Sequence, residues 1–217
     1  MESARPNCYW PGAAVPIKTA HLVQSNHFDA GFTDQLDAVV NSYFDIFFPG
    51  AVALAAELRA KGGEERLRWM TQSWLVALYL DCSAIKRELP ELHCPNATAV
   101  ASFEAAIRRG DVWWHAFPHN AELAAADAGM IRAGVNITHM LDARFGLAPK
   151  RTLSQRDVPG ISRATVPILA AAGVPYISIG TNNGPYKPVS LPNAFVWRDP
   201  STKTESIVTW HNFGYVR

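Results

Sequence analysis

Residues 97–120, ATAVASFEAAIRRGDVWWHAFPHN, contain the unit that decides the fold class. We predict a helix over residues 97–109 that ends at Gly110, because glycine readily adopts the left-handed backbone that closes a helix. Residues 111–117 follow with three large apolar side chains in succession and are predicted to form a strand. The strand leads into a segment with two histidines and an asparagine. A helix, a strand and a polar loop in this order are typical of an α/β fold.

The same alternation extends in both directions along the chain. The predicted strands cover residues 18–25, 67–70, 111–117, 151–154, 174–179, 195–198 and 207–210. The predicted helices cover residues 33–48, 51–60, 73–89, 97–109, 120–145 and 162–172. Pro49-Gly50 separates the first two helices, and Asn120 caps the fifth. Strands that alternate with helices indicate a parallel sheet. We expect residues 1–17 to form an irregular arm and residues 18–217 to form one domain.

The composition is that of a folded, nearly neutral domain. The 217 residues include 20 Lys and Arg against 19 Asp and Glu, and 48% are hydrophobic. This balance excludes a polybasic surface, so we expect no nucleic-acid partner. We find no uncharged apolar run of roughly 18 residues and no signal sequence, so we expect no membrane partner and a cytoplasmic location by default. The three cysteines are too scattered for a disulfide framework and are expected to be reduced.

Polar segments follow four predicted strands, which is where the functional residues of α/β proteins gather. In the first segment His27 and Asp29 are two residues apart, and alternate residues of an extended chain point the same way. An imidazole and a carboxylate on one side are two of the three protein ligands of a common type of divalent-metal site. The alternative is an aspartate that caps a turn beside a surface histidine.

The second segment carries His115 and His119 beside two tryptophans. Pro118 makes this segment an elbow between a strand and a helix, so both imidazoles can point inward. Trp113 and Trp114 alternate along the strand, so at most one of them faces the site, where its ring is suited to stacking on a sugar. The alternative places one histidine in the sheet core and the other at a helix start.

The third and fourth segments supply further candidates. Arg156 and Asp157 at a strand end can bind hydroxyl groups or exchange protons, or they form a local ion pair. His211 follows the last predicted strand, where a lone histidine serves either substrate binding or structure. Glycine-rich nucleotide-binding motifs and the nucleophile elbow of hydrolases are absent from the sequence.

The order of these segments resembles the catalytic domain of glycoside hydrolase family 38, the α-mannosidases. Residues 27–32, HFDAGF, resemble the opening motif H-x-D-P-G-W. Residues 110–120 are similar to G-G-W-V-x-P-D-E, and residues 145–149 and 155–162 are similar to the next strand and the I-D-P-F-G-H-S segment. Residues 168–173 resemble the helix end that follows. The chain resembles either a divergent member of this family or a related member of the glycoside hydrolase and deacetylase barrel superfamily.

The resemblance implies an α/β fold built as a seven-stranded β/α barrel that binds one zinc ion. Closed barrels usually need about 250 residues, so we expect this one to be incomplete at its carboxyl end. The first two metal ligands of the family map to His27 and Asp29, and the third, which is also the nucleophile, maps to His119. An imidazole can bind zinc but is a poor nucleophile for a glycosyl-enzyme, so metal binding carries over better than the retaining mechanism.

We therefore expect a zinc-dependent hydrolase of glycosidic bonds that acts on a carbohydrate, with α-mannosides as the implied substrates. The expected metal ligands are His27, Asp29 and His119, and the expected catalytic residues are Asp157 and His119. The expected substrate-binding residues are Trp114, His115, Gln155, Arg156 and His211.

Two alternatives stay open. Zinc-dependent polysaccharide deacetylases surround the metal with an aspartate and an H-x-x-x-H pair, which Asp29, His115 and His119 would supply to activate water. The other alternative is a barrel that binds carbohydrate without turnover, as the missing nucleophile suggests. An inverting hydrolase would need a second carboxylate about 6.5–9.5 Å from Asp157.

Overall fold

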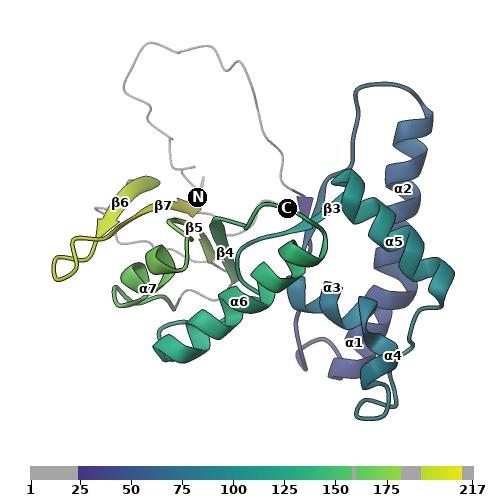
Figure 1. Cartoon of the computed structure of the whole chain (residues 1–217), viewed down its shortest axis with the longest axis horizontal. Helices are drawn as coiled ribbons and strands as arrows, with labels where there is room; N and C mark the ends of the chain where they lie inside the picture. Colours follow the sequence, from purple (N-terminus) through teal and green to yellow (C-terminus); the bar gives the residue numbers. More distant parts are fainter. Residues whose placement is uncertain (1–23, 158–159, 182–191, 212–217) are drawn as a thin grey trace, which may run out of the picture.

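The computed structural model of the protein (Figure 1) describes residues 24–157, 160–181 and 192–211. The predicted amino-terminal arm and residues 18–23 of the first predicted strand lie outside this part of the chain. The elements of residues 24–114 gather on one side of the molecule, and those of residues 128–211 gather on the other (Figure 1).

The first half of the described chain forms a three-stranded parallel sheet. Its strands, in spatial order, are β1, Gln24–Ser25, β2, Trp69–Thr71, and β3, Val112–Trp114. The helices between β1 and β2 are α1, Leu36–Ser42, the π-helix η1, Tyr43–Phe47, and α2, Phe48–Ala60. The helices between β2 and β3 are α3, Ser73–Leu80, α4, Cys82–Ile85, and α5, Ala97–Arg109. Because helical crossovers make every connection, the carboxyl ends of the three strands meet at one edge of the sheet.

The chain forms one uninterrupted helix over Leu36–Ala60, where the sequence predicted a break at Pro49-Gly50. The Phe48 N–H donates to the carbonyl of Tyr43, five residues back, so the helix widens just before Pro49. This wider turn accommodates a residue that lacks an N–H and would crowd the carbonyl four residues earlier in a regular helix. This helix is long and apolar enough to cross a membrane by length and composition alone, with a mean hydropathy of 1.4 and 28% of its most apolar window buried, but the core helix of a soluble protein passes the same test, so it is weak evidence of a membrane span.

Cys82 and Cys94 form a disulfide, contrary to the expectation of reduced thiols. The predicted helix over residues 73–89 is broken, because α3 ends at Leu80 and α4 ends at Ile85. The chain turns back after these helices and brings the two Cα atoms to 5.4 Å. Spacing along the sequence does not reveal this turn, and disulfide formation depends on the distance between the Cα atoms.

The second half forms a four-stranded sheet. Its strands, in spatial order, are β4, Thr152–Asp157, β5, Tyr176–Thr181, β7, Glu205–His211, and β6, Ala194–Arg198. β4, β5 and β7 are parallel, whereas β6 is antiparallel to β7. Helices α6, Ala128–Arg144, and α7, Thr165–Ala171, pack their apolar residues against Leu153, Ile177 and Val208 on one face of this sheet.

The strands do not close into the expected seven-stranded barrel. Over the described ranges they form two sheets, whose facing edges are linked by the hydrogen bond from the Ala116 N–H to the Thr152 carbonyl at 2.8 Å. The sequence pattern predicted residues 195–198 and 207–210 as two strands of a parallel sheet. The residues between them, 199–204, are too few for the helical crossover that parallel neighbours require. The two strands therefore pair as a hairpin.

Helix α6 begins later than predicted. Its cap is Asp127, whose side chain accepts a hydrogen bond from the Met130 N–H at 2.8 Å. The predicted cap, Asn120, instead accepts a hydrogen bond from the Arg156 N–H at 3.1 Å. Asn120 thus joins the segment after β3 to the carboxyl end of β4.

Each half has its own hydrophobic core. In the first half the rings of Phe48, Tyr79 and Phe103 pack with centroids 4.7–5.1 Å apart. These aromatic contacts join α2, α3 and α5 behind the first sheet. In the second half the apolar face of the sheet packs beneath α6 and α7.

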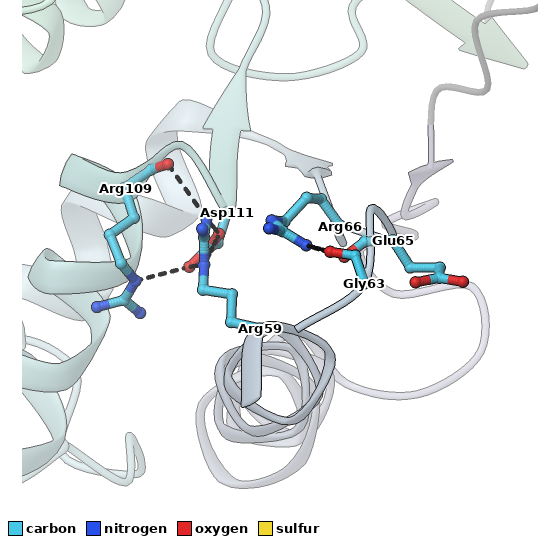
Figure 2. Close-up of polar contacts among 6 residues, drawn as sticks. All are labelled: Arg59, Gly63, Glu65, Arg66, Arg109 and Asp111. Atoms are coloured by element: carbon cyan, nitrogen blue, oxygen red, sulfur yellow. Dashed lines mark hydrogen bonds and ion pairs between the residues drawn. The ribbon is translucent and has the colours of Figure 1, made fainter. Parts of the chain in front are cut away.

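Asp111, buried just before β3, anchors the amino-terminal side of the first sheet (Figure 2). Its carboxylate accepts hydrogen bonds from Arg59 at the end of α2 and from Arg109 Nε at the end of α5, the latter at 2.9 Å. Its carbonyl accepts a hydrogen bond from the Trp69 N–H at 2.8 Å. Two cations balance one buried carboxylate, which would otherwise be costly to bury. The polar segments with functional candidates lie at the opposite edge of this sheet.

Candidate metal centre

A pocket of about 410 Å³ opens at the carboxyl ends of β1 to β4. Its lining residues are His27, Phe28, Asp29, Ala30, Leu36, Gln72, Trp74, His119, Asn120 and Asp157. Most of them belong to the segments that directly follow β1, β2 and β3, and Asp157 is the last residue of β4. Residues far apart in the sequence are thereby gathered around one cavity.

Three side chains of this pocket lie close enough to hold one metal ion. His27 Nε2 lies 3.0 Å from Asp29 Oδ1 and 3.7 Å from Asp157 Oδ2. One ligand atom from each of the three residues can be chosen so that all lie within 4.8 Å of one another. The side chains of His27 and Asp29 are each 30% exposed and that of Asp157 is 28% exposed. The cluster is therefore reachable from solvent.

Tyr43 of η1 holds the segment that carries His27. Its hydroxyl donates to the His27 carbonyl at 2.8 Å and accepts from Asn26 Nδ2 at 2.9 Å. Burial raises the pKa of Tyr43, the hydrogen bond from Asn26 lowers it, and the charge of Asp29 raises it further. The net shift is upward, so the hydroxyl stays protonated and keeps donating. The sequence did not reveal this role, because Tyr43 lies on the apolar stripe of a predicted helix.

Asp157 adopts a backbone conformation that is uncommon for a residue with a side chain. Its φ angle is 74°, in the left-handed region. This conformation interrupts the regular alternation of β4, whose earlier residues Gln155 and Arg156 point to opposite faces. Strained residues of this kind are concentrated at functional sites, where the surrounding structure holds them in place.

His119 lines the same pocket but is not a member of the three-residue cluster. Its Nδ1 lies 2.8 Å from the Asn120 carbonyl, which can only accept a hydrogen bond. Nδ1 therefore carries the proton, and in the neutral ring Nε2 is the basic nitrogen. The structure thus places Asp157, rather than His119, next to His27 and Asp29.

His115 and Trp114 lie behind the pocket, in the core. His115 is 6% exposed, and its Nδ1 accepts a hydrogen bond from the Phe117 N–H at 3.2 Å. Burial, followed by the charges of Arg156 and His119, lowers the pKa of His115 to about 3, so the ring is neutral. Trp114 is fully buried and donates through Nε1 to Asp142 Oδ1 at 2.9 Å. A fully buried ring cannot stack on a sugar, so the predicted role of Trp114 is corrected.

Two aromatic residues that the sequence analysis did not select form a wall of the pocket. The rings of Phe28 and Trp74 meet edge to face with centroids 5.0 Å apart. Trp74 Nε1 donates to Gln72 Oε1 at 2.7 Å, which fixes the orientation of the indole. The rule that predicted the other candidates applies here too, because Gln72 and Trp74 directly follow β2.

The remaining predicted substrate-binding residues lie beside the pocket rather than among its lining residues. Gln155 is buried, and its Oε1 accepts a hydrogen bond from the Ala121 N–H at 2.8 Å, so it positions the segment after β3. Arg156 donates through Nη2 to Ser178 Oγ at 3.0 Å. His211 Nε2 lies 3.1 Å from the same hydroxyl oxygen.

Comparison with known proteins shows a likeness of fold. No protein-family model and no curated protein sequence matches the chain. An α-mannosidase from Enterococcus faecalis V583 matches with a TM-score of 0.63 and 16% identity, over 88% of this chain and 20% of that one. A 4-α-glucanotransferase from Thermococcus litoralis matches with a TM-score of 0.50 and 12% identity, over 78% of this chain and 24% of that one.

This likeness confirms the expected resemblance at the level of the fold, which the chain shares with parts of an α-mannosidase and a 4-α-glucanotransferase. It does not identify family 38, because one of the two proteins is an α-mannosidase and the other is a 4-α-glucanotransferase. The chain spans about a fifth of the length of the first protein and about a quarter of the second.

Proposed function

We propose that the protein is a metal-dependent, carbohydrate-active hydrolase that cleaves glycosidic bonds in this pocket. The observation that carries the proposal is the cluster of His27, Asp29 and Asp157. It lies at the carboxyl edge of parallel strands, where enzymes of related architecture place their chemistry. The fold likeness to an α-mannosidase and a 4-α-glucanotransferase supports carbohydrate as the substrate class.

The donor set of the cluster fits zinc. One imidazole nitrogen and two carboxylate oxygens are ligand types that zinc accepts, and three protein ligands leave one position open, as in catalytic zinc sites. We assign His27, Asp29 and Asp157 to the metal, and His119 stays on the pocket wall outside this cluster, with Nε2 as its basic nitrogen. When bound, such an ion supplies Lewis acidity to a substrate oxygen.

The spacing of the carboxylates favours one of the two stereochemical outcomes. Asp29 and Asp157 are the carboxylate-bearing residues that line the pocket in the described part of the chain, and their ligand atoms lie within 4.8 Å. An inverting pair needs about 6.5–9.5 Å, whereas a retaining pair lies about 5–5.5 Å apart. The inverting version of the hypothesis is therefore dropped. His119 is the side chain assigned to proton transfer, through Nε2.

The wall made by Phe28 and Trp74 is assigned to the apolar face of the sugar ring. Ligand pockets combine aromatic surface with a few polar groups that fix orientation. Here Asn120 and Gln72 lie beside the aromatic pair. Trp74 thereby takes the stacking role that the sequence analysis gave to Trp114.

Deacetylation is the weaker candidate. It requires both histidines of the H-x-x-x-H pair at the metal, but His115 is buried and its Nδ1 is occupied by the Phe117 N–H. His115 is also absent from the residues that line the pocket. Of the three histidines in question, His27 and His119 face the cavity.

Hydrolysis of p-nitrophenyl α- and β-glycosides, measured after metal removal with EDTA and after return of equimolar zinc, tests the proposal. We expect release of p-nitrophenol that depends on zinc and falls by roughly 100-fold or more in Asp157→Asn, because even supporting contacts of metal ligands are worth 10–100-fold. Asp45→Asn is the matched control, since Asp45 forms a comparable pair with His93 at 2.7 Å on the surface.

Three outcomes would contradict the proposal. Turnover that survives both EDTA and Asp157→Asn would remove the metal from the reaction. Release of acetate from acetylated sugars, without cleavage of any glycoside, would favour the deacetylase. Zinc binding without turnover of either substrate set would contradict a hydrolase.

A further inference from the structure

The face of the second sheet opposite α6 and α7 carries two rows of polar residues. The register of β4, β5 and β7 aligns Arg156 with Gly180 and Gly180 with His211. The next row, two residues back along each strand, consists of Ser154, Ser178 and Thr209. Residues two apart on a strand share a face, so both rows lie on the same surface. Neither row contains a carboxylate.

Arg156 is a cation without a carboxylate partner among the described residues. Its guanidinium donates through Nη1 to the carbonyls of Gln155 at 2.9 Å and Ser178 at 3.2 Å, and through Nη2 to Ser178 Oγ. Two of its five N–H groups, at Nε and Nη2, are left for another acceptor. The Arg156 side chain is half-buried, and a charge with reduced access to water gains most from a ligand of opposite sign.

Two further groups on this face supply hydrogen-bond capacity. Arg156 can only donate, so Ser178 Oγ accepts from it, and the same oxygen lies 3.1 Å from His211 Nε2. Burial, followed by the charge of Arg156, lowers the pKa of His211, and in the tautomer in which Ser178 donates to Nε2 the neutral ring presents Nδ1–H as a donor. Ser154 is 5% exposed, and its Oγ has no hydrogen-bond partner in the described part of the chain. Such a buried hydroxyl is uncommon in proteins.

Between Arg156 and His211 the row contains Gly180, a buried residue that adds no side chain of its own. Arg156 and His211 therefore flank a glycine, beside a row of hydroxyl groups. This arrangement suits an oxyanion better than a neutral hydroxyl, because guanidinium pairs with carboxylate and phosphate through charge-assisted hydrogen bonds.

We propose that Arg156, His211 and Ser154, around Gly180, bind an oxyanion group of the substrate, a carboxylate or a phosphate ester. The site adjoins the metal pocket, because Arg156 precedes Asp157 and its backbone N–H donates to Asn120, which lines that pocket. The inference rests on the proposed function in one respect: it makes the substrate of that hydrolase an acidic sugar. Anion binding itself does not depend on the metal or on turnover.

Isothermal titration of the full chain, freed of metal with EDTA, with glucose, glucuronate, glucose 6-phosphate and inorganic phosphate tests the proposal. We expect the anionic ligands to bind at least about ten-fold more tightly than glucose, as the gain of one charge-assisted hydrogen-bond pair would give. The stronger of glucuronate and glucose 6-phosphate identifies the natural oxyanion. Equal affinity for glucose and for both anionic sugars would overturn the proposal.

Point variants distinguish a loss of anion binding from a loss of folding. Arg156→Gln should weaken anion binding about ten-fold or more, whereas Arg198→Gln, which removes an arginine paired with Glu205 on β6 and β7, should leave it unchanged. Ser154→Ala removes a hydroxyl without a partner, so it should preserve stability and still weaken anion binding. Unchanged affinity in Ser154→Ala and in a folded Arg156→Gln or Arg156→Lys protein would overturn the site. Anion binding that persists without zinc-dependent turnover would contradict the proposed function alone.

Discussion

Asp157 has an uncommon backbone conformation, and its carboxylate belongs to the candidate metal site. Its φ of 74° lies where a side chain costs roughly 1–2 kcal/mol, and its carboxylate lies 3.7 Å from His27 Nε2. Asparagine and aspartate tolerate this region better than other residues with a Cβ, and β-branched residues tolerate it least. The position therefore links the stability of the fold to the candidate metal site.

Substitutions of Asp157 should separate these two effects. Asp157→Asn keeps the tolerated backbone and should change the free energy of unfolding by less than about 0.5 kcal/mol in the absence of metal. Asp157→Val should lower it by roughly 2 kcal/mol, because a β-branched side chain is forced into the left-handed region. Urea denaturation of both variants measures the difference. Equal stability of the two variants would show that the backbone at this position is unstrained.

His115 should make stability depend on pH. Its pKa falls from 6.5 in the unfolded chain to about 3 in the fold, mainly through burial. The unfolded chain therefore binds a proton below pH 6.5 that the folded protein does not, so the contribution of neutral His115 is complete above pH 6.5 and is lost as the pH falls toward 3. Between pH 7 and pH 5 the loss is about 2 kcal/mol.

The comparison is between wild type and His115→Asn, in which an amide oxygen can accept the Phe117 N–H. Urea midpoints from pH 7 to pH 5 should fall less steeply in the variant, by the contribution of this one group. Parallel pH profiles for the two proteins would contradict the assignment of a buried, neutral imidazole.

Individual side chains were predictable from the sequence only where position along a strand decides their surroundings. His27, Asp29, His119 and Asp157 all line one pocket, because each follows or ends a parallel strand. The choice of Trp114 failed because alternation predicts that one of two neighbouring tryptophans is buried without telling which.

At the scale of elements, helix boundaries were predictable where capping residues leave one choice. α5 spans Ala97–Arg109 as predicted, because Gly110 adopts φ 77° and closes it. α6 was placed too early, because both Asn120 and Asp127 are cap-type residues and tertiary contacts decide between them. Asn120 is taken by the Arg156 N–H of β4, which no local pattern reveals.

The disulfide between Cys82 and Cys94 should stabilise the turn that joins α4 to α5. It closes a loop with a sequence separation of 12, for which the chain-entropy account gives about 3 kcal/mol. The double variant Cys82→Ser, Cys94→Ser should lower the free energy of unfolding by about 2–3 kcal/mol, and dithiothreitol should lower it similarly in wild type but not in the variant. A wild-type protein whose stability is insensitive to dithiothreitol would contradict the bond.

At the scale of the whole molecule, two sheets with separate cores meet at the pocket. β1 to β3 contribute His27, Asp29, Trp74 and His119 through the segments that follow them, and β4 contributes Asp157. The alternation of elements wrongly predicted a barrel, because it did not take into account that the short turn between β6 and β7 reverses the chain direction. The residues of the candidate site come together because they follow or end parallel strands whose carboxyl ends lie side by side. A closed barrel is not required for this arrangement.

Zinc binding by metal-free protein tests the central claim most directly. Isothermal titration should give about one zinc per wild-type chain, with binding lost or weakened roughly 100-fold in His27→Gln and in Asp157→Asn. His93→Gln removes a histidine from the comparable surface pair with Asp45 and should bind zinc like wild type. A folded wild-type chain that takes up no zinc, or an Asp157→Asn chain with wild-type affinity, would contradict the metal centre proposed here.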